Sequence, residues 1–148
     1  YIGLDVSATA LNEARNSFPN GKFFVIDDGE SWPLEDESTD FLFSSEVIEH
    51  IYDVENAFIE MARILKPGGQ CLLTTPYHGF LKNIVIALLA FDSHYNPTGP
   101  HIRFFSRKTL FQLMFKHSLT PINWGYYGRF YPFSHSIFVL AQKVAKGV

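Results

Sequence analysis

The sequence predicts an α/β domain in which a mostly parallel β-sheet is flanked by helices and ends in a C-terminal antiparallel hairpin. Two observations lead to this fold class. Short apolar segments alternate with amphipathic ones in the first half of the chain, and two β-rich runs lie close together near its C-terminal end. Strand–helix alternation favours a parallel sheet covered on both faces, whereas paired β-rich runs favour a hairpin.

The elements of the first half have recognisable boundaries. Apolar strands are expected at residues 1–5, 22–28 and 39–45. Ser7 can cap a helix that ends before the PNG sequence, and Asp53 can cap a second helix over residues 54–65. The KPGG sequence is expected to end that helix and to precede a fourth strand at 69–76.

The second half begins with a long aromatic segment at residues 77–105, which contains a helix candidate at 80–91. Connections of this length in a small domain are usually lids or binding loops, so we expect a substrate lid within a single domain of residues 1–148. Ser106 can cap a helix over 107–117. The runs TPINWGYY and SHSIFVLAQK are the two strands of the expected hairpin.

Composition and charge limit the kinds of partner that the protein is expected to bind. The 148 residues carry a net charge of −3, which gives no basic field for nucleic acid. Cys71 is the single cysteine and lies in an apolar run, as expected of a buried thiol in a reducing compartment such as the cytoplasm. The longest apolar stretch, at 83–91, is too short to span a membrane but can form a lid or contact a membrane surface.

Polar residues stand at three successive strand ends. Ligands of open parallel sheets bind beyond the carboxyl ends of the strands. A carboxylate at Asp5 can accept both hydroxyls of a ribose, and Asp28 with the Gly29 backbone can bind the edge of an adenine. The strand ends therefore predict a nucleoside site, whose full predicted set is Asp5, Val6, Asp28, Gly29, Ser44 and Ser45.

The stretch from YIGLDVS to KPGG resembles the class I S-adenosylmethionine-dependent methyltransferases, in particular the type 11/23 group. The resemblance lies in an ordered set of motifs: a strand ending in an acid, D-x-x-x-x-P, D-F, E-H and L-K-P-G-G, followed later by HIRFFSRKTLFQLM and a hairpin. It implies a Rossmann-like seven-stranded sheet with a reversed last strand. It also implies S-adenosylmethionine as cofactor, a small-molecule oxygen or nitrogen as methyl acceptor, Asp5 at the ribose, and Asp28 with Gly29 at the adenine.

One feature departs from that family. The family's first strand and glycine-rich loop come before the strand that ends in the acid, whereas here Asp5 already ends the first expected strand. We therefore expect the chain to be the C-terminal portion of a longer polypeptide. We also expect this portion alone to bind the cofactor weakly or not at all.

The sequence SSEVIEHI suggests a metal site. If it forms a helical turn, Glu46, Glu49 and His50 share a face, and His101 can be a fourth ligand. The arrangement resembles that of ubiquinone-pathway O-methyltransferases and small-RNA 2′-O-methyltransferases, in which a divalent cation chelates a vicinal diol or catechol. The alternative is the E-H motif of type 11 sequences that need no metal.

Tyr77 and His78 follow the fourth strand on the side where substrates enter, so His78 is a candidate general base. Two other functions stay open. An NAD-dependent oxidoreductase also has an acid after its second strand, although the loop from Asp28 to Pro33 and the terminal hairpin argue against it. The other is a non-catalytic fragment that only binds a partner.

Overall fold

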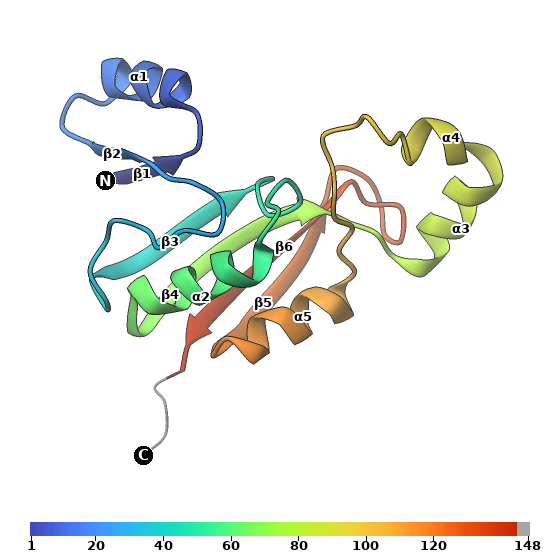
Figure 1. Ribbon diagram of the computed structural model, residues 1–148. Coiled ribbons are helices and arrows are strands. Elements are labelled where there is room, and N and C mark those ends of the chain that lie inside the picture. Colours follow the sequence, from blue (N-terminus) through green and yellow to red (C-terminus); the bar gives the residue numbers. More distant parts are fainter. Residues whose placement is uncertain (145–148) are drawn as a thin grey trace.

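Two β-sheets form the frame of the molecule in the computed structural model, which describes residues 1–144 (Figure 1). The first is a parallel pair, β1 (Ile2–Asp5) and β2 (Lys22–Val25), joined by the helix α1 (Ala8–Ser17). The second has the strand order β3-β4-β6-β5. Its strands are β3 (Thr39–Ser45), β4 (Leu65–Pro76), β5 (Leu119–Tyr127) and β6 (Ser136–Lys143).

The four-stranded sheet has a single reversed strand. Strand β3 pairs with β4 in parallel, and β6 runs antiparallel to both β4 and β5. The C-terminal hairpin is therefore confirmed. Its second strand lies between β4 and β5, so the strand that joins the hairpin to the rest of the sheet is β6.

The three predicted N-caps are present. The Ser7 hydroxyl accepts a hydrogen bond from the Ala10 amide at the start of α1, and Asp53 accepts one from the Asn56 amide at the start of α2 (Val54–Ile64). At the start of α5 (Arg107–Lys116), Ser106 and Thr109 form a reciprocal capping box. These caps satisfy amides that have no partner inside a helix.

The KPGG sequence does not form a separate turn. Helix α2 ends at Ile64, and β4 begins at the next residue. The register between β3 and β4 shifts at Thr39/Phe41, and Gly68 has a φ of +80°, a conformation that favours glycine. Residues 66–69 thus form an irregularity inside a strand that starts four residues earlier than predicted.

The main core lies between the four-stranded sheet and the helices α2 and α5, which cover one face of it (Figure 1). Phe58, Met61, Leu110 and Met114 of the helices are at most 2% exposed. Cys71 of β4 is fully buried here, and burial raises the pKa of its thiol to about 12. Cys71 is therefore a core residue, as expected.

The segment after β4 forms two helices rather than the one predicted at 80–91. Helix α3 (Phe80–Leu89) is followed by its C-cap residue, Ala90, and then directly by the short α4 (Phe91–His94). In Figure 1 both project beyond the strand ends of the four-stranded sheet. Across residues 1–144, no helix has the length and apolar character needed to cross a membrane.

Candidate functional site

A cavity of about 330 Å³ lies beyond the carboxyl ends of β1 and β2. Its lining joins these two strand ends to the segment that precedes α2. Four of the predicted cofactor-binding residues line it, namely Asp5, Val6, Asp28 and Gly29. Ser44 and Ser45 are not in this lining, and the Ser45 hydroxyl instead forms a 2.9 Å hydrogen bond with Thr74.

The two acids at the strand ends have different partners. One Asp5 carboxylate oxygen accepts a 2.7 Å hydrogen bond from the Ser7 amide, and within residues 1–144 the other oxygen has no protein donor. Asp28 accepts hydrogen bonds from the backbone amides of Tyr52 and Asp53, at 2.5 and 3.0 Å. Asp28 therefore ties the loop after β2 to the start of α2, while Asp5 keeps acceptor capacity facing the cavity.

Apolar side chains form much of the remaining wall. They come from the loop after β2, the segment before α2 and the first turn of α2, and include Ile26, Trp32, Val47, Ile51 and Ala57. Trp32 is not among the site residues predicted from the sequence. It packs against the core and also lines the cavity. Its position in the loop four residues after Asp28 was the available signal.

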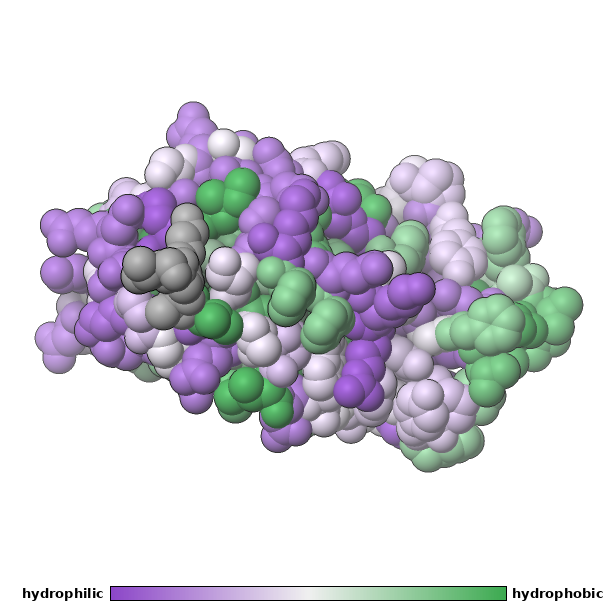
Figure 2. Space-filling model, turned by 90° about the horizontal axis from the view of Figure 1, so that it is seen from below, coloured by the Kyte–Doolittle hydropathy of each residue, from purple (hydrophilic) through white to green (hydrophobic). Residues whose placement is uncertain are grey.

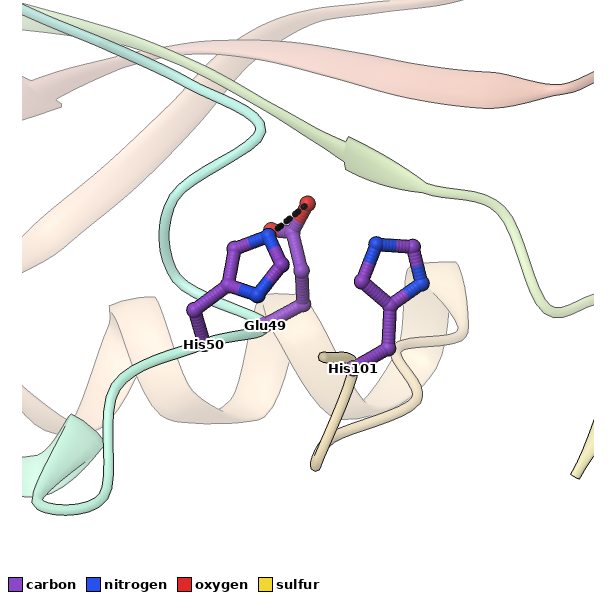
Figure 3. A group of neighbouring side chains, drawn as sticks. All are labelled: Glu49, His50 and His101. Atoms are coloured by element: carbon purple, nitrogen blue, oxygen red, sulfur yellow. Dashed lines mark ion pairs between the residues drawn. The ribbon is translucent and has the colours of Figure 1, made fainter. Parts of the chain in front are cut away.

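A second group of side chains lies beside this cavity. Single ligand atoms of Glu49, His50 and His101 lie within 4.8 Å of one another (Figure 3). The Glu49 side chain is buried, and its Oε2 accepts a 3.0 Å hydrogen bond from the Thr75 hydroxyl. In the part of the chain that the structure describes, its Oε1 has no hydrogen-bond partner. Burial raises the pKa of Glu49 above its ordinary value.

The tautomer of His50 follows from its hydrogen bond. Its Nδ1 lies 2.9 Å from the Pro100 carbonyl oxygen, which can only accept, so Nδ1 carries the proton of the neutral ring. The lone pair is then on Nε2, which lies 3.9 Å from Glu49 Oε1. An imidazole oriented in this way by a carbonyl is a common arrangement for metal ligands.

The segment that carries His101 is fixed to the segment that carries Glu49. The amides of Ile102 and Arg103 donate to the Glu49 carbonyl oxygen at 3.1 and 3.2 Å. The Arg103 guanidinium donates to the carbonyl oxygens of Ile51, at 2.8 Å, and Tyr52. Two segments about fifty residues apart are thus held in one geometry before any ligand binds.

Glu46 does not join this group. The helical turn predicted over residues 46–50 is not formed, because Glu46 has a φ of +53° and a turn follows it. Its carboxylate instead accepts hydrogen bonds from hydroxyls on β4, β5 and β6: Thr74 at 2.8 Å, Tyr127 at 3.0 Å and Ser136 at 3.3 Å. Glu46 thus connects the end of β3 to three other strands.

Tyr77 and His78 follow β4, outside the lining of the 330 Å³ cavity. Burial lowers the pKa of His78 to about 4, and its ring meets Phe104 edge-on at a centroid distance of 4.7 Å. Burial raises the pKa of Tyr77 to about 12. Both side chains are therefore neutral near pH 7, and His78 is a weak proton acceptor.

Comparison with known proteins connects this geometry to a family. Residues 1–73 match the family model described as a methyltransferase domain. The biotin biosynthesis bifunctional protein BioHC of Cellvibrio japonicus is 36% identical over 63% of this chain and 18% of its own length. The malonyl-[acyl-carrier protein] O-methyltransferase of Methylococcus capsulatus is 30% identical over 63% of this chain and 34% of its own.

A ubiquinone/menaquinone biosynthesis C-methyltransferase of Campylobacter jejuni is 40% identical over 45% of this chain and 28% of its own. The chain thus spans about a third or less of these relatives. A solved SAM-dependent methyltransferase from Methanosarcina mazei has the same fold, with a TM-score of 0.74 and 17% identity over 98% of this chain and 82% of that one. Residues 1–73 therefore belong to the methyltransferase-domain family, and the described chain has the fold of solved SAM-dependent methyltransferases.

Proposed function

We propose that the protein is an S-adenosylmethionine-dependent methyltransferase that methylates an oxygen or nitrogen of a small molecule. The observation that carries this proposal is the cavity with Asp5 and Asp28 at its rim and apolar side chains along its wall. The free Asp5 oxygen suits a ribose hydroxyl, and the wall of Ile26, Trp32 and Ile51 suits a purine. The cofactor supplies an electrophilic methyl group, so the protein's main contribution is positioning.

Calorimetric titration of the full-length polypeptide with S-adenosylhomocysteine tests the nucleoside site. Asp5→Asn keeps the shape but loses the charge, and we expect it to weaken binding roughly tenfold, as for the loss of one charge-assisted hydrogen bond. Glu13→Gln on the exposed face of α1 is the matched control and should bind as the unmodified protein does. Equal affinity in all three proteins would contradict the proposal, as would displacement of S-adenosylhomocysteine by NADH.

A metal-assisted reaction is the second candidate, and Glu49 favours it. Its buried Oε1 has no partner in the described residues, and the Nε2 lone pair of His50 faces it. Two imidazoles and one carboxylate form a donor set that suits Zn²⁺ or a similar cation better than Mg²⁺. We propose that Glu49, His50 and His101 hold a divalent cation, which would lower the pKa of a bound acceptor hydroxyl.

Calorimetry with Zn²⁺ and with Mg²⁺ tests the cation site directly, without an activity assay. We expect Zn²⁺ to bind with one ion per chain, and Glu49→Gln or His101→Ala to weaken that binding at least tenfold. His135→Ala is the control, because this exposed histidine lies directly before β6 and outside the group of Glu49, His50 and His101. Binding that is absent, or that responds equally to all three substitutions, would contradict the cation site.

We also propose that residues 77–105 cover the methyl acceptor and that Tyr77 and His78 contact it. A neutral His78 can accept a hydrogen bond from the acceptor group. His78→Ala should then lower kcat at least tenfold while the affinity for S-adenosylhomocysteine stays the same. A loss of cofactor affinity without a change in kcat would instead indicate a structural role.

A further inference from the structure

Two consecutive peptide units in the wall of the cavity are held between opposite charges. The carbonyl oxygen of Ile51 and the amide of Tyr52 belong to one peptide unit, and the carbonyl oxygen of Tyr52 and the amide of Asp53 belong to the next. The Arg103 guanidinium donates to both carbonyl oxygens, and the Asp28 carboxylate accepts from both amides. Each unit therefore has the cation at its carbonyl side and the anion at its amide side.

The geometry suits both charged groups. Arg103 uses Nε, which lies 2.8 Å from the Ile51 oxygen, and Nη2, and these two nitrogens share one edge of the planar guanidinium. Asp28 uses one carboxylate oxygen for each amide, at 2.5 and 3.0 Å. A peptide unit has a dipole of about 3.5 D with its negative end at the oxygen. Because each dipole is aligned between the two charges, the hydrogen bonds at its two ends strengthen each other.

These peptide units carry part of the cavity lining, which includes Ile51, Tyr52 and Asp53. Ile51 and Tyr52 lie in no helix or strand, so the regular hydrogen bonds of a helix or sheet do not fix their backbone. The Ile51 side chain also packs against the main core. The shape of this wall therefore depends on the side chains that bind its backbone groups.

Arg103 has no acidic partner that competes for its charge. Within residues 1–144 it forms no ion pair with a carboxylate, whereas Arg63 pairs with both Asp36 and Glu60. The Arg103 side chain is partly buried. Its charge is thus directed to the two carbonyl oxygens and, across the peptide units, to Asp28.

Arg103 stands near the C-terminal end of the segment that we propose covers the methyl acceptor. Figure 2 shows hydrophobic residues gathered at the end of the molecule where α3 and α4 of this segment lie, and Leu88 and Leu89 are 77% and 81% exposed. Helix α3 buries none of its residues, and Lys82 instead binds carbonyl oxygens at the end of β4 and in the β5–β6 loop. Polar contacts thus hold the segment near both of its ends, and those of Arg103 are shared with the cavity wall.

We propose that Arg103 is a positioning residue of the nucleoside site. Together with Asp28 it holds the peptide units between residues 51 and 53, and thereby the Ile51 side chain, where a bound nucleoside contacts them. Nucleoside affinity then depends on a residue of the covering segment that lies outside the cavity lining. This inference rests on the proposed function, and the experiment below separates the two.

Calorimetric titration of the full-length polypeptide with S-adenosylhomocysteine tests the role of Arg103. Arg103→Ala should weaken binding roughly tenfold, because the two carbonyl oxygens lose their charged donor and the wall loses its fixed shape. Arg107→Ala removes the same charge from an exposed position on α5, where the guanidinium lies over the Trp124 ring, and should bind as the unmodified protein does. Equal losses in the two variants would overturn the inference.

Free guanidinium ion distinguishes positioning from a general loss of structure. Added to Arg103→Ala at concentrations well below those that unfold proteins, it can donate to the two carbonyl oxygens from the space that the side chain has left. We expect it to raise the affinity of this variant for S-adenosylhomocysteine at least roughly threefold. Arg107→Ala should not respond, and sodium chloride at the same ionic strength should not replace guanidinium. No recovery, or equal recovery with both salts, would overturn the inference.

A double-mutant cycle tests whether Arg103 and Asp28 act on the same peptide units. Asp28→Ala, Arg103→Ala and the double variant are titrated with S-adenosylhomocysteine. If the two side chains hold the same units, the second substitution costs less once the first is present, so the double variant loses less affinity than the product of the two single losses. Losses that multiply in the double variant would overturn the link between the two residues.

Circular dichroism shows whether each variant is folded. If Arg103→Ala does not fold, Arg103→Lys takes its place, because one ammonium group keeps the charge but cannot match the two-donor edge, and it should still lower the affinity severalfold. Absence of binding to the unmodified protein would overturn the proposed function together with this inference. Equal affinity of the unmodified protein and the Arg103 variant would overturn the inference alone.

Discussion

Glu46 and Glu49 are three residues apart, but their carboxylates have opposite surroundings. Three hydroxyl donors from β4, β5 and β6 surround Glu46. Glu49 is buried with a single hydroxyl donor, and burial raises its pKa. A carboxylate whose acceptor positions are filled holds structure in place, whereas one with an open buried oxygen can receive a ligand.

Replacing Glu46 should therefore affect stability rather than ligand binding. Glu46→Gln keeps one oxygen but removes the charge that strengthens three hydrogen bonds, so we expect the free energy of unfolding to fall by about 1 kcal/mol. Urea denaturation measures this change. Zn²⁺ affinity should stay the same in this variant, and a loss of Zn²⁺ binding comparable to that of Glu49→Gln would show that Glu46 is a ligand after all.

The depressed pKa of His78 predicts a loss of stability in acid. The pKa of His78 is about 4 in the folded state and 6.5 ordinarily. Between pH 6.5 and 4 the unfolded chain therefore binds a proton at this ring, whereas the folded chain does not. The contribution of the neutral His78 ring to the free energy of unfolding is complete above pH 6.5. It is lost as the pH falls towards 4, by up to about 3 kcal/mol. His78→Phe removes the titration and should flatten this part of the stability profile. Identical profiles for both proteins would contradict the burial-driven shift.

At the scale of elements, helix α2 fixes the irregular loop that forms one wall of the cavity. Glu60 Oε2 accepts the Trp32 amide at 2.6 Å, and the Arg63 guanidinium donates to the carbonyl oxygens of Leu34 and Trp32 at 2.7 and 2.9 Å. Arg63 also pairs with Glu60 and Asp36, and the Arg63 hydrogen bond is the main cause that lowers the pKa of Glu60. A loop without regular structure thus has its backbone groups satisfied.

Loss of the hydrogen bonds made by Arg63 should lower the free energy of unfolding. Arg63→Lys retains the charge but cannot reach four acceptors with one ammonium group, so we expect it to lower the free energy of unfolding by about 2 kcal/mol. Lys66→Gln breaks the exposed ion pair with Asp40 and should cost less than about 0.5 kcal/mol. Thermal unfolding compares the two, and equal losses would contradict the role assigned to Arg63.

The helices and strands that could be predicted from the sequence are those that depend on neighbouring residues. The caps at Ser7, Asp53 and Ser106 and the apolar strands depend on neighbouring residues, so they could be predicted. The position of β6 between β4 and β5 depends on pairing across the sheet, which no local pattern encodes. The irregularity at residues 66–69 likewise depends on the register with β3.

The same distinction applies to the candidate site. The acids at the ends of β1 and β2 were predictable because strand ends can be recognised in the sequence. The donors to Asp28 are backbone amides, which every non-proline residue has, so nothing in the sequence identified Tyr52 and Asp53. The wrong expectation for Glu46 came from assuming helical spacing where the backbone adopts a positive φ.

At the scale of the whole molecule, the two sheets are unequal. In residues 1–144, β1 pairs only with β2, and β3 pairs only with β4. Phe41 and Phe43 of β3 are 52% and 63% exposed, since they lie on the face opposite the main core. The parallel pair with α1, in which only Leu11 and Phe23 are buried, therefore has less apolar support than the four-stranded sheet.

Amide hydrogen exchange should differ between the parallel pair and the four-stranded sheet. We expect the amides of β4 and β6 to exchange slowest, because each has a partner on both sides and borders the core. The amides of β1 and β2 should exchange at least about a hundredfold faster, since this small unit can open without the rest. Mass spectrometry of peptic fragments measures both regions, and equal protection would contradict local opening.

His50 belongs to both halves of the candidate site, because it lines the cavity and stands in the group with Glu49 and His101. A shared ring makes the two proposed occupants thermodynamically linked. If a bound cation changes the affinity for the nucleoside by some factor, a bound nucleoside must change the affinity for the cation by the same factor, because the four binding steps form a thermodynamic cycle. If binding of the cation and the nucleoside is cooperative, His50 keeps an orientation that serves both. If it is antagonistic, the first ligand turns the His50 ring away from the position that the second requires.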